Sequence, residues 1–455
     1  MKKLNTLLCL GLLLFASCEK LVEVDNPSDQ IGTSQVFEDA DIANAALGSL
    51  YAELRDGSII SGGSAGTGCL LGSYTDDLVC YLYDLNGYLD INYNQVQETN
   101  STIKFTWHTS YTLIYYANSI IYGAENSSVL SEMDKNRIKG EALFIRSLIY
   151  FYLQQLFGDI PYTTSLDYEY NRKISKTDAV EVLEKLEADV TEAIGFLEDD
   201  YRDPGRIYVN RKAAQLLLAR ICLLQSKWSL AEQMADTILL SPLYEFQTDI
   251  TEVFHKSSSH ILWQMSPEYS GDATREATFF YVENSVPNSY VLTQDLINTF
   301  DMADLRRQIW IAPVIYEGQT WYRPYKYKNH VSGSNYDECS IVFRLEEVYF
   351  IKAEALARQN RFDEALPYLN ATRERAGLTA ITSLSGEDFF NEMLAEKRRE
   401  FFTEFGLRFL DLKRMGRLDD LSVVKPNWED YMQVWPLPQS EMLMNPNLAS
   451  QNTGY

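Results

Sequence analysis

Histidine, cysteine and basic residues are scarce in this sequence. Its 455 residues include four histidines and six cysteines, and 40 basic residues stand against 64 acidic ones. No C-x-x-C pair and no His/Cys group with metal-ligand spacing occurs, which argues against a zinc site. The net charge of −24 at pH 7 repels phosphate backbones, and this argues against general nucleic-acid binding. The same charge is compatible with a preference for uncharged ligands.

Two motifs that would indicate a catalytic or nucleotide site are also missing. The sequence contains no H-E-x-x-H motif, and its Gly-rich residues 62–68 lack the Gly-Lys-Ser/Thr of a phosphate-binding loop. We therefore expect no catalytic residue, no bound metal and no cofactor. The two carboxylates of a glycoside hydrolase have no fixed sequence spacing, because the pair is defined in space. A hydrolase therefore stays open as an alternative.

The first 34 residues have the pattern of a lipoprotein export signal. Two lysines precede a short apolar run, and two small residues precede Cys18 in the lipobox-like sequence FASC. We predict that residues 1–17 are a signal peptide, that Cys18 carries acyl chains such as palmitate, and that residues 18–34 form a lipidated tether. An ordinary secretory signal with an incidental cysteine is the alternative. No later segment is long and apolar enough to span a bilayer.

Four cysteines remain in the body of the chain, at positions 69, 80, 222 and 339. Cys69 and Cys80 are close enough in sequence to form a disulfide. Buried free thiols are the other interpretation, because free cysteine behaves as a small apolar residue.

Most of the body is predicted to be helical, and one helix pair repeats. Apolar residues recur at spacings of four and three over residues 138–156, as on one buried helix face. The segments ARICLLQSKWSLAEQ and AEALARQNRFDEALP begin at Ala219 and Ala353, 134 residues apart. Each predicts a helix, a short turn and a second helix that begins near Trp228 or Phe362. Such pairs are typical of tetratricopeptide repeats.

Four long motifs resemble signatures of the SusD/RagB family and occur in the family's order. They are NRIKGEALFIRSLIYFYLQQLFGDIPY at residues 136–162, RLEEVYFIKAEALARQNRFDEALPYLNATRERAGL at 344–378, EKRREFFTEFGLRFLDLKRMGR at 396–417 and VWPLPQSEMLMNPNLASQNTGY at 434–455. With the lipobox-like Cys18, the resemblance covers essentially the whole mature chain. Leu407 stands where many members have His, and Thr453 stands where Pro is usual. Neither departure changes the family assignment.

The resemblance implies a mainly α fold, a superhelix of tetratricopeptide-like helix pairs with irregular, partly β insertions. It implies an N-terminal SusD-like helical region with an aromatic insertion at residues 35–260, and a C-terminal SusD/RagB region at residues 261–455 packed into the same body. The implied role is that of an outer-membrane lipoprotein, held by its lipid anchor and facing the cell exterior. It would capture oligo- or polysaccharide without cleaving it and deliver it to a SusC-like TonB-dependent transporter. The alternatives are a lipid-anchored glycoside hydrolase and a protein-binding helical-repeat module.

Two stretches that interrupt the helical pattern carry the candidate sugar contacts. Residues 58–100 are rich in Gly, Tyr, Asp and Asn, and residues 260–335 mix short strand-like runs with turns and aromatic residues. Sugar binding needs flat apolar rings beside hydrogen-bonding groups, and loops on a rigid scaffold commonly carry binding residues. The predicted contacts are Tyr74, Asp77, Tyr81, Tyr83 and Tyr88 in the first stretch and Tyr281, Trp310, Trp321 and Tyr322 in the second. Trp321 and Tyr322 are favoured, because the preceding Gly-Gln-Thr predicts an exposed loop.

One cluster of charged residues could be mistaken for acid–base machinery. It comprises Glu396, Arg398, Arg399, Glu400 and Asp411. Their helical spacing favours local salt bridges over catalysis. Trp107, in a segment that resembles a core helix of the family, is predicted to pack in the interior.

Overall fold

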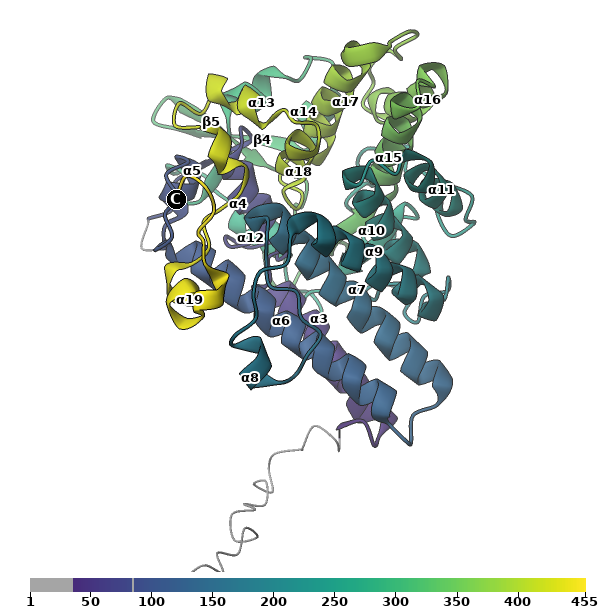
Figure 1. Cartoon of the computed structure of the whole chain (residues 1–455). Helices are drawn as coiled ribbons and strands as arrows, with labels where there is room; N and C mark the ends of the chain where they lie inside the picture. The colour runs from purple at the N-terminus through teal and green to yellow at the C-terminus, as the bar shows by residue number, and fades with distance from the viewer. Residues whose placement is uncertain (1–35, 84–85) are drawn as a thin grey trace, which may run out of the picture.

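The computed structural model describes residues 36–83 and 86–455, so Cys18, the signal peptide and the tether lie outside the described residues. Figure 1 shows a helical body with a small sheet region at its upper left. The longer helices are α3 (Ala40–Gly57), α6 (Ser101–Asn126), α7 (Glu132–Phe157), α9 (Ala179–Phe196), α10 (Arg211–Leu224), α11 (Trp228–Leu239), α15 (Leu345–Arg358), α16 (Phe362–Arg375) and α17 (Gly386–Phe401). From α6 to α16 these helices pack each against the next, as in a helical-repeat superhelix. The predicted mainly α fold is confirmed.

The predicted repeat is present as two equivalent helix pairs. Helices α10 and α15 are both 14 residues long and occupy the same positions in the two copies. The turns that follow them each contain a left-handed residue at the same place, Ser226 with φ 58° and Asn360 with φ 61°. Trp228 and Phe362 are the first residues of α11 and α16, and both are half-buried against the main core. Residues that align in sequence between the two copies therefore also occupy equivalent positions in the structure.

Side-chain caps define where several of the long helices begin. Asp39 accepts hydrogen bonds from the first turn of α3, Asn100 from that of α6 and Ser131 from that of α7. Each cap satisfies backbone N–H groups that have no partner inside the helix. Helix α7 ends at Phe157 and is followed by Gly158, whose φ of 73° disfavours residues with a side chain.

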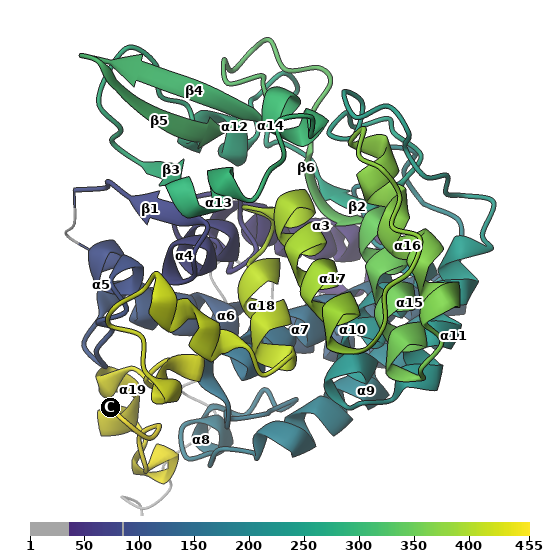
Figure 2. The ribbon, with the colours of Figure 1, turned by 90° about the horizontal axis from the view of Figure 1, so that it is seen from above.

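The four-stranded sheet joins the two predicted insertions. Its strand order is β1-β3-β5-β4, and all neighbours are antiparallel. Strand β1 (Leu78–Cys80) comes from the first insertion, whereas β3 (Tyr290–Leu292), β4 (Ile311–Tyr316) and β5 (Gln319–Pro324) come from the second. Figure 2 shows this sheet along the top edge of the molecule.

Shorter elements complete the two insertions. The predicted strand-like run near residue 261 forms β2 (Ile261–Met265), which pairs with β6 (Ser340–Arg344). The first insertion was expected to be irregular, but it also contains the short helices α4 (Thr67–Tyr74) and α5 (Tyr88–Asn92). Tertiary packing of their apolar side chains stabilises these helices despite the glycine content of the segment.

Two apolar cores lie inside the molecule. The larger one fills the space between the helix pairs, and the smaller one lies against one face of the four-stranded sheet. The four cysteines at positions 69, 80, 222 and 339 are all buried and free. Of the two interpretations of Cys69 and Cys80, the structure therefore supports buried free thiols over a disulfide.

A buried charge network connects α17 to the β insertion. It comprises Arg306, Lys326, Arg344, Glu346, Arg375, Glu396, Glu400 and Glu404, each less than 10% exposed. The Glu400 carboxylate accepts hydrogen bonds from Arg344 at 2.7 Å and from Arg375 at 2.5 Å. The expectation of local salt bridges was therefore only partly right, because most partners lie on other elements.

Removal of one charge from this network should destabilise the fold. Glu400→Gln removes a carboxylate that Arg306, Arg344 and Arg375 share, and breaking a buried pair typically costs about 3–5 kcal/mol. We expect that loss in the free energy of unfolding, measured by urea denaturation. Glu184→Gln is the matched control, because Glu184 is exposed on α9. Equal stabilities of the two variants would contradict a structural role for the network.

The same variant should change the response to acid. Burial alone would raise the pKa of the Glu400 carboxyl, but Arg375, Arg344 and Arg306 lower this pKa far below its usual range. A carboxyl with a depressed folded pKa contributes stability that is fully present above its unfolded pKa of about 4.3 and is lost as the pH falls toward the folded value. The unfolding free energy should therefore fall below about pH 4.5, and fall less steeply in Glu400→Gln.

Candidate ligand-binding surface

The segment around Trp321 is a β-hairpin and not the predicted loop. Strand β4 ends at Tyr316 and β5 begins at Gln319, so the turn consists of Glu317 and Gly318. Their φ values are 49° and 78°, and a type I′ hairpin turn requires positive φ at both positions. Trp321 therefore lies within a strand, where its direction is fixed by the register of the sheet.

The alternation of β5 separates Trp321 from its neighbour. Tyr322 pairs with Leu292 and packs against the smaller core, whereas Trp321 and Arg323 lie on the opposite face, which we call the outer face of the sheet. Tyr81 extends the pairing of β1 with β3, because its N–H donates to the carbonyl oxygen of Ser289 at 2.6 Å. By the same alternation Tyr81 also belongs to the outer face.

Trp321 and Tyr81 are in direct contact on this face. The indole N–H of Trp321 donates a hydrogen bond of 3.3 Å to the Tyr81 hydroxyl. Val314 lies opposite Trp321 on β4 and is buried, whereas Trp321 is half-buried and Tyr81 is exposed. The two insertions, about 240 residues apart in sequence, thus contribute adjacent rings to one solvent-accessible surface.

Arg323 lies among further rings of the same region. Its guanidinium carbon is 5.3 Å from the ring centroid of Tyr281 and 4.7 Å from that of Tyr325, distances at which a cation is attracted by the ring. The ring of Tyr281 stacks on His330, with 3.7 Å between centroids and 9° between planes. We call Tyr81, Tyr281, Trp321, Arg323, Tyr325 and His330 together the aromatic surface.

Arg323 is the most available hydrogen-bond donor of the aromatic surface. Its guanidinium forms no hydrogen bond and no ion pair with any residue in the described part of the chain. Burial lowers the pKa of Arg323, although the group stays positively charged at neutral pH. The result is a partly desolvated row of N–H donors beside flat rings, which suits a polar ligand with stackable faces.

Comparison with known families identifies the chain. A family model described as starch-binding and associating with the outer membrane matches residues 23–223, and the model of the SusD family matches residues 315–455. The chain belongs to the SusD/RagB family. A full-length relative in this family is SusD-like protein P25 of Formosa agariphila, which is 24% identical over 100% of both chains. The starch-binding protein SusD of Bacteroides thetaiotaomicron is 33% identical over 138 residues, which are 28% of this chain and 23% of that protein.

Solved structures of SusD-like proteins share the fold. A SusD superfamily protein from Bacteroides vulgatus superposes with a TM-score of 0.81 at 21% identity, covering 92% of this chain and 99% of that one. Surface glycan-binding protein A of Bacteroides thetaiotaomicron, solved with laminarihexaose, gives 0.75 at 18% identity, with coverages of 90% and 99%. These similarities confirm the SusD-like architecture.

Three of the predicted contacts belong to the interior of this SusD-like fold, so their assignment was wrong. Tyr74, Asp77 and Trp310 are each at most 1% exposed. The Tyr74 hydroxyl donates to the carbonyl oxygen of Met432 at 2.9 Å, and the Asp77 carboxylate accepts from Arg398 at 2.9 Å. Trp310 donates its indole N–H to a backbone carbonyl and packs in the smaller core. Burial and internal bonding leave these side chains no surface for a ligand.

The other predicted contacts lie in different environments. Tyr81, Tyr281 and Trp321 lie in the aromatic surface, while Tyr322 faces the smaller core and Tyr88 is half-buried with its hydroxyl 3.3 Å from that of Ser64. Tyr83 is 89% exposed, just beyond Tyr81 in the sequence.

The residues that the sequence did not indicate are Arg323, Tyr325 and His330. Trp321, Arg323 and Tyr325 are spaced two residues apart, which in a strand places them on one face. Because a loop was predicted for this segment, that spacing was not used.

The geometry around Ser64 does not form a hydrolase nucleophile. Residues 62–66 read GGSAG and fit the G-x-S-x-G pattern, which marks a nucleophile only where a strand leads into a helix. Here the segment follows helix α3, and no histidine among the described residues is bonded to the Ser64 hydroxyl. Within residues 36–83 and 86–455, no group of three His, Cys, Asp or Glu side chains is arranged to hold a metal ion.

Two tryptophans should respond differently to truncation. Trp107 is buried in α6, with ring centroids 4.9 Å from Tyr111 and 5.0 Å from Phe157, so Trp107→Ala should cost about 3–5 kcal/mol of unfolding free energy. Trp321→Ala removes a half-buried ring from the outer face and should leave the melting temperature nearly unchanged. Differential scanning calorimetry of both variants checks this. A larger loss in Trp321→Ala than in Trp107→Ala would contradict the assignment of the two rings.

Proposed function

We propose that this SusD-family protein binds a neutral oligo- or polysaccharide on the aromatic surface of its four-stranded sheet and does not cleave it. The observation that carries the proposal is the contact of Trp321 with Tyr81, next to a guanidinium that has no partner among the described residues. Flat rings cover the apolar faces of pyranose units, and Arg323 donates to their hydroxyl oxygens. The net charge of −24 favours an uncharged ligand over a polyanion.

The size of the surface favours a chain of several sugars over a single sugar. One ring that covers a sugar face removes about 40–60 Å² of apolar area from water, which contributes about 1–1.5 kcal/mol. That is less than the entropy lost when a ligand is immobilised. Several rings must therefore act together, and a repeated polymer adds avidity by offering many equivalent units.

Named relatives support a saccharide as the ligand class. One similar structure is a laminarin-binding SusD-like protein, with a TM-score of 0.75 at 22% identity and coverages of 91% of this chain and 99% of that one. The glycan-binding protein A structure contains laminarihexaose, and the partial sequence match is to a starch-binding protein. All of these named ligands are neutral saccharides, as proposed for this chain.

A binding role without catalysis is favoured over the lipid-anchored hydrolase. The carboxylates of Glu396, Glu400 and Glu404 are buried and held by guanidinium or ammonium groups. Such buried groups have no access to a substrate. The aromatic surface presents an arginine and tyrosines, and no carboxylate pair belongs to it.

Truncation of Trp321 should abolish most of the glycan affinity. We expect Trp321→Ala to weaken binding about tenfold or more, since a stacked ring and its neighbours act together. Isothermal calorimetry with maltohexaose, laminarihexaose, cellohexaose and xylohexaose provides the measurement. Tyr122→Ala is the matched control, because Tyr122 is an exposed ring on α6, away from the sheet. Equal affinity of both variants would refute the site, and released products would refute the non-catalytic role.

We further propose that lipidated Cys18 anchors the protein to the outer membrane, with its body facing the cell exterior. Across the residues that the structure describes, helix length and hydropathy together provide no candidate membrane span. A glycan captured outside the cell then requires a partner for import, and a SusC-like TonB-dependent transporter is the partner we propose.

The anchor and the partner can be tested in native membranes. Cys18→Ala should move the protein from the membrane fraction to the soluble fraction, because the acyl chains that hold it are missing. Affinity purification of the unaltered protein should recover a TonB-dependent transporter. Cys222→Ala, a buried cysteine in the body, controls for general effects of cysteine loss. Membrane association that persists in Cys18→Ala, or repeated recovery of the protein alone, would contradict this proposal.

A further inference from the structure

A cleft of about 650 Å³ lies far from the sheet, between α6, residues 161–174 and the C-terminal segment that carries α19 (Gln439–Met444). Its volume is within the range of about 300–1,000 Å³ that is typical of small-molecule sites. In Figure 2 the cleft elements α8 (Tyr168–Asn171) and α19 lie at the lower edge, whereas the sheet lies along the upper edge. The cleft is therefore separate from the aromatic surface.

Internal hydrogen bonds hold the walls of the cleft in place. The Tyr111 hydroxyl of α6 donates to the carbonyl oxygen of Pro161 at 2.8 Å. On the opposite side, the Asn445 amide donates to the carbonyl oxygen of Ile174 at 2.8 Å. The loop between these two contacts is thus fixed at both ends, so the cleft is formed before any ligand arrives. A preformed cleft lowers the entropy lost on binding.

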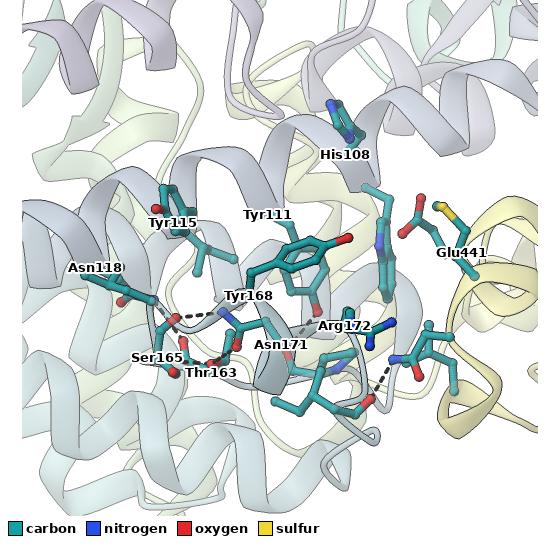
Figure 3. A pocket seen from close by; sticks show the side chains of 18 residues that line it. His108, Tyr111, Tyr115, Asn118, Thr163, Ser165, Tyr168, Asn171, Arg172 and Glu441 are labelled. Atoms are coloured by element: carbon teal, nitrogen blue, oxygen red, sulfur yellow. Dashed lines mark hydrogen bonds between the residues drawn. The ribbon is translucent and has the colours of Figure 1, made fainter. Parts of the chain in front are cut away.

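Aromatic rings form both the base and the rim of the cleft. Trp107 and Tyr111 pack against each other at the base, and Tyr115 and Tyr168 stand at the rim. Figure 3 shows Tyr168 in front of Tyr111, with Glu441 on one side and Tyr115 on the other. Tyr168 is 74% exposed, and its hydroxyl forms no hydrogen bond with a described residue. Its ring is therefore available as a stacking face.

Two polar groups of the cleft have no partner among the described residues. The half-buried carboxylate of Glu441 makes neither a hydrogen bond nor an ion pair there, and the indole N–H of Trp107 makes no hydrogen bond. Burial raises the pKa of Glu441, and His108 and Lys104 partly offset this effect. A carboxylate that has lost part of its water without gaining a protein partner is a strong acceptor for a ligand hydroxyl.

We propose that this cleft is a second saccharide site, which holds one or two neutral sugar units between Tyr168, Glu441 and Trp107. The assignment rests on the proposed glycan-binding function, since it extends that function to a second place on the molecule. Stacking faces, the carboxylate acceptor of Glu441 and the N–H donors of Trp107 and Arg172 match a pyranose ring with vicinal hydroxyls. A ligand that carries one kind of charge fits less well, because the cleft is lined by both the Glu441 carboxylate and the Arg172 guanidinium. Two sites on different faces would let one protein hold two parts of a polymer.

The test uses saturation-transfer NMR on the full-length chain in detergent, with maltose, cellobiose, laminaribiose and xylobiose as probes. At least one disaccharide should bind, and Tyr168→Ala and Glu441→Gln should each weaken it about tenfold. Tyr122→Ala, a matched ring on α6 outside the cleft, should leave this binding intact. Both cleft substitutions are at partly or fully exposed side chains, and melting curves confirm that the variants fold.

The outcomes separate this inference from the proposed function. If no disaccharide signal falls in Tyr168→Ala and Glu441→Gln, the second site is refuted, whatever the aromatic surface does with hexasaccharides. If the cleft takes choline, a quaternary ammonium, in preference to every disaccharide, the saccharide assignment is refuted. If Trp321→Ala leaves hexasaccharide affinity unchanged while the cleft variants lose it, the proposed aromatic surface is wrong and the cleft assignment stands.

Discussion

The buried carboxylates of α17 are the constraint on which much of this structure depends. Glu396 and Glu400 lie in the interior, where an uncompensated charge costs several kcal/mol. Arg306 and Lys326, which flank the β4–β5 hairpin, donate to Glu396 and to Glu404 respectively. Lys326 also donates to the carbonyl oxygens of Glu400 and Phe402, both at 2.8 Å. Both ends of the hairpin are therefore held against α17, although the hairpin belongs to an insertion.

This attachment explains how an insertion can present a defined binding surface. The strands between Arg306 and Lys326 can bend only as far as their fixed ends allow, and their inner face is held by the smaller core. Register then determines that Trp321 faces outward and that it meets Tyr81 from a distant part of the chain. Rings held in place before binding lose little entropy when a ligand stacks on them. The buried charge network therefore contributes to ligand binding by fixing the position of the hairpin.

The sequence predicted the parts of the structure that depend on local periodicity. The apolar spacing of α7 and the repeated pairs around Trp228 and Phe362 correspond to real helices at the expected places. Prediction failed where long-range pairing decides the outcome. Nothing near Asp77 in the sequence indicates that Arg398, 321 residues away, takes up its carboxylate. Tyr74 and Trp310 occur in segments whose composition is typical of sugar-binding loops. Residues elsewhere in the chain nevertheless pack against both side chains and bury them.

The most direct test of the account is a crystal structure of the protein with a neutral hexasaccharide to which calorimetry shows that it binds. The account predicts an intact oligosaccharide on the outer face of the sheet, with a pyranose ring stacked on Trp321 and a hydroxyl oxygen within hydrogen-bonding distance of the Arg323 guanidinium. A hexasaccharide bound elsewhere, with Trp321 and Arg323 left in contact with solvent, would contradict the central claim, as would a cleaved product in the site.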